Sequence, residues 1–301
     1  MTLVALPSDG QGAPTARPVR RRLSWQWLGL VPFLVFAAAF LLIPTSYLVV
    51  GSFHDLAGNT TLQNYADLAQ PEIASSYLTS IEISFVTAVL GGIFGFLLAY
   101  SVISGGLPRV LRGALMTFSG VASNFAGVPL ALAFTFTLGR LGFLTIFMKS
   151  FLGIDLYGNG FTLYSKLAIE IVYLYFQFPL MVLIMAPAID GLRQEWREAS
   201  ENMGASSFQY WRHIALPILM PSLLGTMILL FGNSFGAQAT AFQLTGGQIN
   251  MVTMLITRQL RGDVLNNVNL GYAVAMGMVA IMGLTIIVYI WLQRRAERWQ
   301  R

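Results

Sequence analysis

Residues 198–217, EASENMGASSFQYWRHIALP, form a polar island of 20 residues between two long apolar segments. Each flanking segment is long enough to cross the roughly 30 Å of a bilayer's hydrocarbon at about 1.5 Å per residue. An interruption of this kind is typical of the connection between two membrane-spanning helices. Its role depends on the side of the membrane that it faces.

The composition around this island is that of a membrane protein. The 301 residues are 55% hydrophobic and only 10% charged, whereas soluble domains carry about 25% charged residues. The net charge of +5 comes from arginines clustered at the ends of apolar runs, where orientation in a bilayer explains them. We therefore expect an all-α polytopic membrane protein and no nucleic-acid partner. The chain contains no cysteine, which excludes disulfides and thiolate metal sites.

Six segments are long and apolar enough to span a membrane. They cover residues 28–50, 77–103, 113–138, 167–189, 217–235 and 271–292. Residues 1–24 are predicted to be a disordered leader, and residues 25–301 the membrane domain. The first apolar segment is too long for the core of a signal peptide, the rival interpretation. Shorter helices are expected near 62–69 and 251–260, the second as a re-entrant or interfacial segment.

The basic residues predict the orientation. With a cytoplasmic N-terminus, all but five of the 18 Lys and Arg residues fall on the cytoplasmic side, as the positive-inside rule requires. The five on the other side are Arg140, Lys149, Lys166, Arg258 and Arg261. Both termini are therefore predicted to be cytoplasmic, and residues 198–217 to lie in the cytoplasm between the fourth and fifth spans.

The spans themselves carry two kinds of signal. Small residues at four-residue spacing, such as Gly91 and Gly95, predict close helix packing. The third span is interrupted at its centre by Ser119, Ser123, Asn124, Gly127 and Pro129. Breaks at membrane depth are tolerated only where protein or a water-filled cavity covers the backbone, so this span is the first candidate to line a pathway.

Residues 193–217 predict two short cytoplasmic helices. The first places Trp196, Ala199, Ser200 and Met203 on one stripe, and Gly204 suits its left-handed stop. The second is expected to start at Ser206 or Ser207, to carry Phe208, Trp211 and Ile214 on one face and to end before Pro217. These helices are either gripped by another protein or rest at the lipid headgroups.

The chain shows no catalytic set. It has no G-x-x-x-x-G-K-[ST] loop, so it lacks the phosphate cradle needed to hydrolyse ATP by that route. His54 and His213 are isolated, and neither a nucleophile triad nor a metal-ligand spacing occurs. A non-catalytic protein without a metal site is predicted.

Residues of the polar island also match a known sequence pattern. The island contains Glu198-Ala199-Ser200, then Gly204 after three residues, Ile214 after a further nine, and Leu216-Pro217 after one more. This pattern is similar to the motif E-A-A-x3-G-x9-I-x-L-P of bacterial ATP-binding-cassette importer permeases. Only Ser200 departs from it, where the family usually has Ala. The motif also lies before the penultimate span, as in that family.

The resemblance implies a mechanism and a set of partners. Residues 193–217 would be a coupling element that docks into a separate ATPase dimer, which binds ATP and Mg, while this chain binds no cofactor. Glu198, Ala199, Ser200 and Gly204 would belong to this ATPase-coupling element, and Ile214, Leu216 and Pro217 would anchor it to the fifth span. A second permease subunit, a related chain in preference to a copy of this one, and an extracytoplasmic solute-binding protein would complete the complex in the bacterial inner membrane.

The sequence indicates the substrate less clearly. The sequence TLQNY at 61–65 and Phe235-Gly236 resemble the branch that imports polyamines, ferric iron, phosphonates or thiamine. Glu82 and Glu170 would form an acidic vestibule for a cation such as a polyamine, or simply sit favourably at positive helix ends. Asn124 and Gln177, near the centres of their spans, would contact substrate or hold helices together. An anionic cargo, and a self-sufficient secondary transporter or channel, remain the alternatives.

Overall fold

The chain is helical in the computed structural model, which describes residues 29–261 and 267–297. The helices are α1 (Val31–Ala37), α2 (Ile43–Ser52), α3 (Gln63–Ala66), α4 (Pro71–Ser104), α5 (Arg109–Asn124), α6 (Val128–Leu138), α7 (Phe143–Phe151), α8 (Lys166–Asp190), α9 (Gln194–Asn202), α10 (Ser207–Tyr210), α11 (Leu216–Gly236), α12 (Gln238–Thr245), α13 (Val252–Arg261) and α14 (Val268–Glu297). The predicted leader, 1–24, lies outside the described residues. Short helices at α3 and α13 match the expectations for 62–69 and 251–260.

Within the described residues, six helical stretches are long and apolar enough to cross a membrane. They are Val31–Ser52, Pro71–Ser104, Val128–Phe151, Lys166–Asp190, Ser207–Gly236 and Val268–Arg294. The prediction of an all-α chain with six spans is therefore confirmed, and the second, fourth and sixth spans lie close to their predicted bounds. The orientation of the termini stays a prediction.

The described residues up to Ser46 and those from Tyr47 onward form separate compact units. In the described part of the first unit, α1 and the π-helical turn Ala38–Leu42 bury no side chain. Phe33 and Phe40 are about two-thirds exposed, at 66% and 69%. A helix that is apolar on all sides is suited to a hydrocarbon environment.

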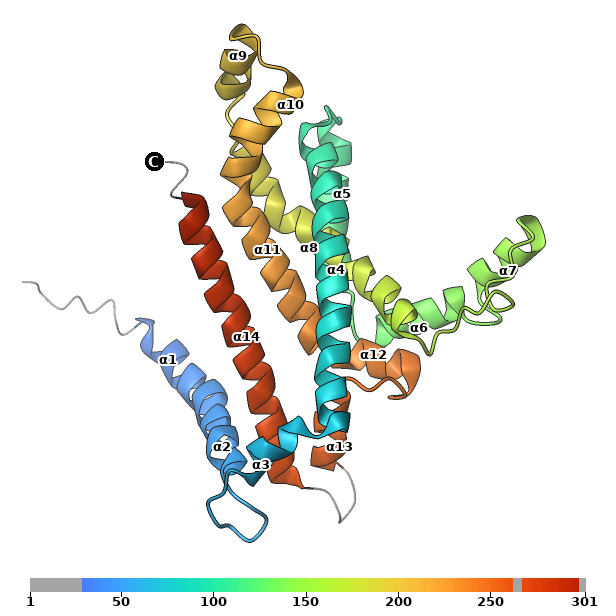
Figure 1. Cartoon of the computed structure of the whole chain (residues 1–301). Helices are drawn as coiled ribbons and strands as arrows, with labels where there is room; N and C mark the ends of the chain where they lie inside the picture. Colours follow the sequence, from blue (N-terminus) through green and yellow to red (C-terminus); the bar gives the residue numbers. More distant parts are fainter. Residues whose placement is uncertain (1–28, 262–266, 298–301) are drawn as a thin grey trace, which may run out of the picture. The chain divides into compact units, whose positions relative to one another are not determined.

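The core of the second unit lies where α4 packs along α8 and α11 (Figure 1). Glycines allow this approach: a Cβ atom at Gly95 would lie 2.6 Å from the Met181 Cβ, and one at Gly91 would lie 2.8 Å from the Gln177 Cβ. Backbones that approach this closely gain dispersion contacts that replace the hydrophobic drive absent in lipid. The close packing predicted from the small residues of α4 is confirmed.

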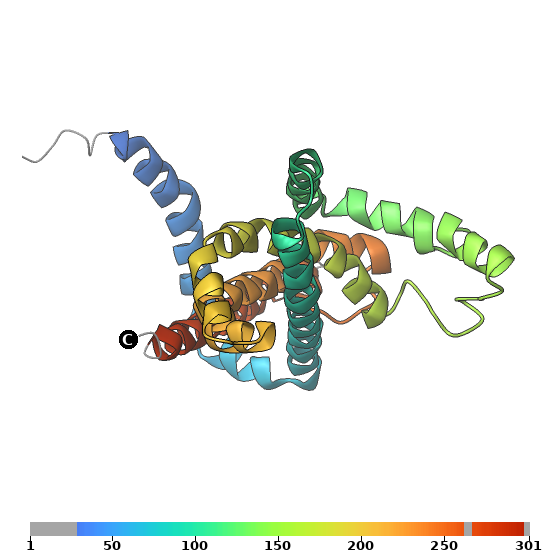
Figure 2. The ribbon, with the colours of Figure 1, turned by 90° about the horizontal axis from the view of Figure 1, so that it is seen from above.

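The third predicted span, 113–138, is wrong as a single membrane-crossing helix. It divides into α5 and α6 at residues 125–127, where Gly127 adopts a positive φ of 74°. A residue with a Cβ atom is strained in this region of φ. The break was expected from the polar residues around Asn124. The third candidate crossing is instead Val128–Phe151, and α6 and α7 extend away from α4 and α8 in both views (Figures 1 and 2).

The predicted end of the second cytoplasmic helix before Pro217 is also wrong. A π-helical turn, Trp211–Ala215, joins α10 to α11, so one helical stretch runs from Ser207 to Gly236. Proline lacks an N–H group, and its ring clashes with the carbonyl group four residues earlier. A wider turn directly before Pro217 lets the helix continue past this ring.

Candidate functional site

The polar island folds as two helices joined by a tight turn. Helix α9 ends before Gly204, whose φ is +78°. Space around Gly204 is open, with no atom within 4 Å of a Cβ built there, so the backbone conformation alone explains this glycine. Ser206 then caps α10: its side chain accepts from the Gln209 N–H, and the Gln209 side chain accepts from the Ser206 N–H. The predicted helix stop and N-cap are confirmed.

One side of this element is anchored to the bundle. Ser200 is buried at 1% exposure, and its hydroxyl donates to the Arg197 carbonyl group at 2.7 Å. The Trp211 ring lies edge-on to Tyr100 of α4, with 4.8 Å between the ring centroids. Phe96, one turn earlier on α4, contacts the same indole at 6.4 Å. Aromatic edge contacts of this kind add directional attraction to apolar burial, so they fix the start of the long helix against α4.

The other side is exposed. Glu198 and Ala199 face outward, and Met203 and Phe208 are 79% and 70% exposed. Each predicted stripe is partly packed and partly exposed: Ser200 is buried whereas Met203 is exposed, and Trp211 packs on α4 whereas Phe208 is exposed. Exposed apolar side chains beside a carboxylate are suited to recognition by another protein.

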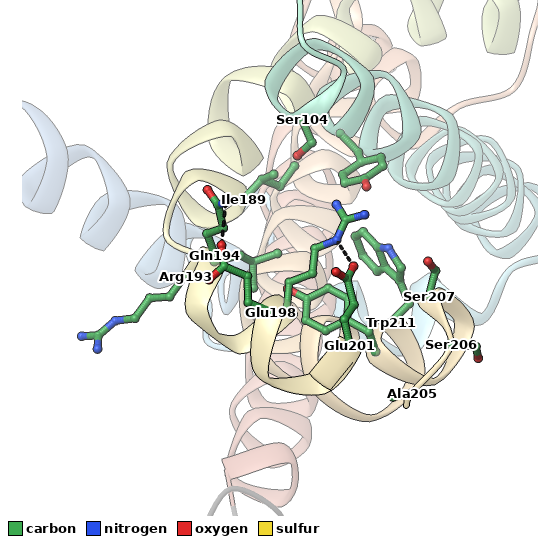
Figure 3. Close-up of a pocket in the computed structure, with 14 residues that line it drawn as sticks. Ser104, Ile189, Arg193, Gln194, Glu198, Glu201, Ala205, Ser206, Ser207 and Trp211 are labelled. Carbon is green, nitrogen blue, oxygen red and sulfur yellow. Dashed lines mark hydrogen bonds and ion pairs between the residues drawn. The ribbon is translucent and has the colours of Figure 1, made fainter. Parts of the chain in front are cut away.

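Charged residues of α9 interact mainly with each other. The Arg197 Nε atom lies 3.0 Å from a Glu201 carboxylate oxygen, and the Gln194 side chain donates to Glu198 at 2.9 Å. The Arg193 guanidinium lies 5.7 Å from the centroid of the Trp196 ring and points away from the other residues drawn in Figure 3. Contact of these helices with lipid headgroups, the alternative to recognition by another protein, stays a prediction.

A cavity of about 610 Å³ lies between this element and the adjacent ends of α4 and α8. Its wall includes Tyr100, Ser104, Glu198, Ser206 and Trp211 (Figure 3).

An ion pair that the sequence did not predict lies at the end of α8, directly before this element. Arg112, in the first turn of α5, approaches Asp190, the last residue of α8, at 2.5 Å. The two residues are 78 positions apart, so no local pattern could have indicated their contact. The pair links α5 to the residue that leads into the coupling element.

The predicted pathway residues fall into two groups. Glu82 forms an ion pair with Lys166 at 2.5 Å, and Glu170 interacts electrostatically with both. The predicted acidic vestibule therefore has one net negative charge instead of two. Asn124 is exposed at the end of α5, where its amide donates to the Gly120 carbonyl group.

Gln177 lies elsewhere, fully buried between α8 and α11. Its amide nitrogen donates to the Leu230 carbonyl group and to Ser234. Ser234 in turn shares a hydrogen bond of 2.9 Å with Thr87 of α4. In this conformation Gln177 holds helices together, the second of the two roles expected for it.

Comparison with known proteins gives a consistent picture. Residues 91–301 match the family model of the "Binding-protein-dependent transport system inner membrane component". The chain is 28% identical over 229 residues to the sulfate transport system permease protein CysT of Salmonella typhimurium, which covers 75% of this chain and 77% of that protein. It is 25% identical over 265 residues to the spermidine/putrescine transport system permease protein PotB of Haemophilus influenzae, covering 85% and 88%.

A solved structure supports the fold. A chain of a bacterial ABC transporter involved in the import of the acidic polysaccharide alginate is similar with a TM-score of 0.71. The match covers 90% of this chain and 95% of that chain, at 17% sequence identity. At this identity the likeness concerns the fold alone.

Proposed function

Because the chain belongs to the family of binding-protein-dependent transport system inner membrane components, we propose that residues 193–217 couple solute import to ATP hydrolysis on a separate ATPase dimer. The chain is the non-catalytic, multi-pass permease of such a system in the inner membrane. In the proposed complex it pairs with a second permease subunit and receives its cargo from an extracytoplasmic binding protein. Both termini and residues 193–217 then face the cytoplasm.

The observation that carries this proposal is the continuous helical stretch Ser207–Gly236. It begins beside the exposed Phe208 and extends to Ser234, which bonds to α4 and α8 deep in the bundle. A displacement imposed on its exposed end moves the buried end as one body, since a packed helix transmits strain instead of absorbing it.

The exposed face supplies the contact with the ATPase. Glu198 and Ala199 on α9, with Met203 and Phe208 on either side of Gly204, form a surface of one carboxylate and apolar side chains. Closure of the ATPase dimer would pull on this surface. Ile214, Leu216 and Pro217 would pass the movement into α11.

The test is to reverse the charge of this surface. We expect Glu198→Arg and Gly204→Asp to leave the protein in the membrane but to abolish ATP-driven transport and co-purification with the ATPase. Glu195→Arg, the same change on the same exposed helix, is the matched control and should retain transport. Normal transport by either of the first two variants would contradict the proposal that this surface docks on the ATPase.

The side that this surface faces can be measured separately. The chain has no cysteine, so Met203→Cys introduces a single thiol at the turn. We expect a membrane-impermeant thiol reagent to label it in inside-out vesicles and not in right-side-out vesicles. The opposite pattern would reverse the proposed orientation.

For the cargo, we infer a small cation such as a polyamine. The cluster of Glu82, Glu170 and Lys166 has a net negative charge at one end of the bundle, and the PotB-like permease covers 85% of this chain. Similarity to CysT favours sulfate as the second candidate. The reconstituted complex should show ATPase activity stimulated by putrescine or spermidine with their binding protein. Stimulation by sulfate alone would overturn the cationic assignment.

A further inference from the structure

The hydrogen bond between Thr87 and Ser234 places residue 234 beside the middle of α4. Helix α4 has 34 residues, Pro71–Ser104, so Thr87 stands at its midpoint. Gln177, which also bonds to Ser234, is near the middle of α8, Lys166–Asp190. Two spanning helices therefore give the same depth for this part of α11.

Asn233 precedes Ser234 and faces the other way. Ser234 is fully buried, whereas Asn233 is exposed and its side chain makes no hydrogen bond to the part of the chain that the structure describes. The same exposed stripe of α11 holds Ser222, Leu229 and Gly236, at helical spacing. A carboxamide at the centre of a bilayer is costly against hydrocarbon and normally faces protein or a water-filled cavity.

The break between α5 and α6 lies at a similar level of α8. The break between α5 and α6 leaves Phe125 and Ala126 exposed, and the Gly127 N–H donates to the Thr240 hydroxyl at 2.8 Å. Phe125 contacts Tyr175, two residues before Gln177, with 6.3 Å between the ring centroids. Irregular backbone at membrane depth is tolerated only where protein or water covers it.

We propose that Asn233 lines an uncharged mid-membrane section of the transport pathway and hydrogen-bonds the cargo there. This inference rests on the proposed function as a permease. An amide both donates and accepts, so it replaces part of the hydration shell of a charged solute without binding it as tightly as a counter-ion. A site that releases its cargo easily suits a pathway that must be emptied in each cycle.

The native chain has no cysteine, so single thiols report water access directly. In the complete transporter in proteoliposomes, we expect Asn233→Cys to react with a charged, water-soluble methanethiosulfonate reagent, and spermidine with its binding protein to slow the reaction. Ile287→Cys on α14, whose native side chain is 64% exposed, is the lipid-facing control. It should react about tenfold more slowly, because a thiol in hydrocarbon does not ionise.

Three results would overturn the inference. The first is absence of labelling at Asn233→Cys in every nucleotide state, which would indicate a lipid-facing surface. The second is oxidative cross-linking of Asn233→Cys to the neighbouring permease without labelling, which would indicate a subunit interface. The third is labelling that neither spermidine nor sulfate slows, each added with its binding protein.

A functional measurement separates this inference from the coupling proposal. Asn233→Leu should lower the transport rate several-fold while co-purification with the ATPase stays normal, and Asn233→Gln should restore part of the rate. Water access at position 233 does not depend on docking, so labelling of Asn233→Cys would survive even if Glu198→Arg proved harmless.

Discussion

The two ends of the helical stretch Ser207–Gly236 are held by opposite kinds of contact. At the α10 end, the Trp211 ring packs against Tyr100 and Phe96. At the α11 end, Ser234 forms hydrogen bonds with Thr87 and Gln177. The difference follows from the surroundings: near water, apolar contact gives most of the stability, whereas in lipid an unpaired polar group is costly and hydrogen bonds join helices. Substitutions at the two ends should therefore differ in their effect on stability.

The largest effect should come from the aromatic end. Trp211→Ala removes an indole that contacts two rings of α4, and because the side chain is half-buried we expect a loss of about 2 kcal/mol of stability. The thermal denaturation midpoint of the purified permease measures it. Trp211→Phe, which keeps a ring, should lose less than half as much, and equal losses would contradict the aromatic contact.

A substitution that removes the hydrogen bonds at the α11 end should lower the stability less. Gln177→Met removes two hydrogen bonds to α11, and interhelical hydrogen bonds in membranes contribute about 0.6 kcal/mol each. Its Oε1 atom is buried without a partner among the described residues, so removal of the amide also relieves a penalty. We expect a net loss of about 1 kcal/mol or less by the same measurement. A loss larger than that of Trp211→Ala would reverse the comparison.

The ion pair between Arg112 and Asp190 should contribute little to stability. Arg112 and Asp190 are 37% and 49% exposed, and exposed pairs contribute about 0.5 kcal/mol. Asp190→Asn should therefore barely change the denaturation midpoint. If the pair guides α5 during transport, the exchange Arg112→Asp with Asp190→Arg will recover transport lost in either single variant; an unchanged rate in all three variants would exclude that role.

The smallest effect is expected at Ser200. Its hydroxyl bonds only within α9, to the Arg197 carbonyl group, and Ala forms helices better than Ser by a few tenths of a kcal/mol. Ser200→Ala should raise the denaturation midpoint slightly and leave transport unchanged. Loss of transport in this variant would show that the hydroxyl itself contacts the ATPase.

Local patterns predicted local structure well. The Gly204 stop, the Ser206 cap and the break after Asn124 depend on residues within one or two turns, and each is present. The continuation of α10 through Pro217 was missed, because a π-helical turn has no strong sequence signal. The contacts of Gln177 with Ser234 and of Arg112 with Asp190 were missed for another reason: they join residues 57 and 78 positions apart.

The sequence by itself determined the fold class, the number of spans and the position of the motif that resembles that of importer permeases, since hydrophobic runs and short spacings are properties of neighbouring residues. Tertiary structure decided which side chains face out. It turned Phe208 outward and Trp211 inward, gave Glu82 a partner in Lys166, buried Gln177 and exposed Asn233. These outcomes depend on how distant helices pack, and packing is fixed only when the whole chain has folded.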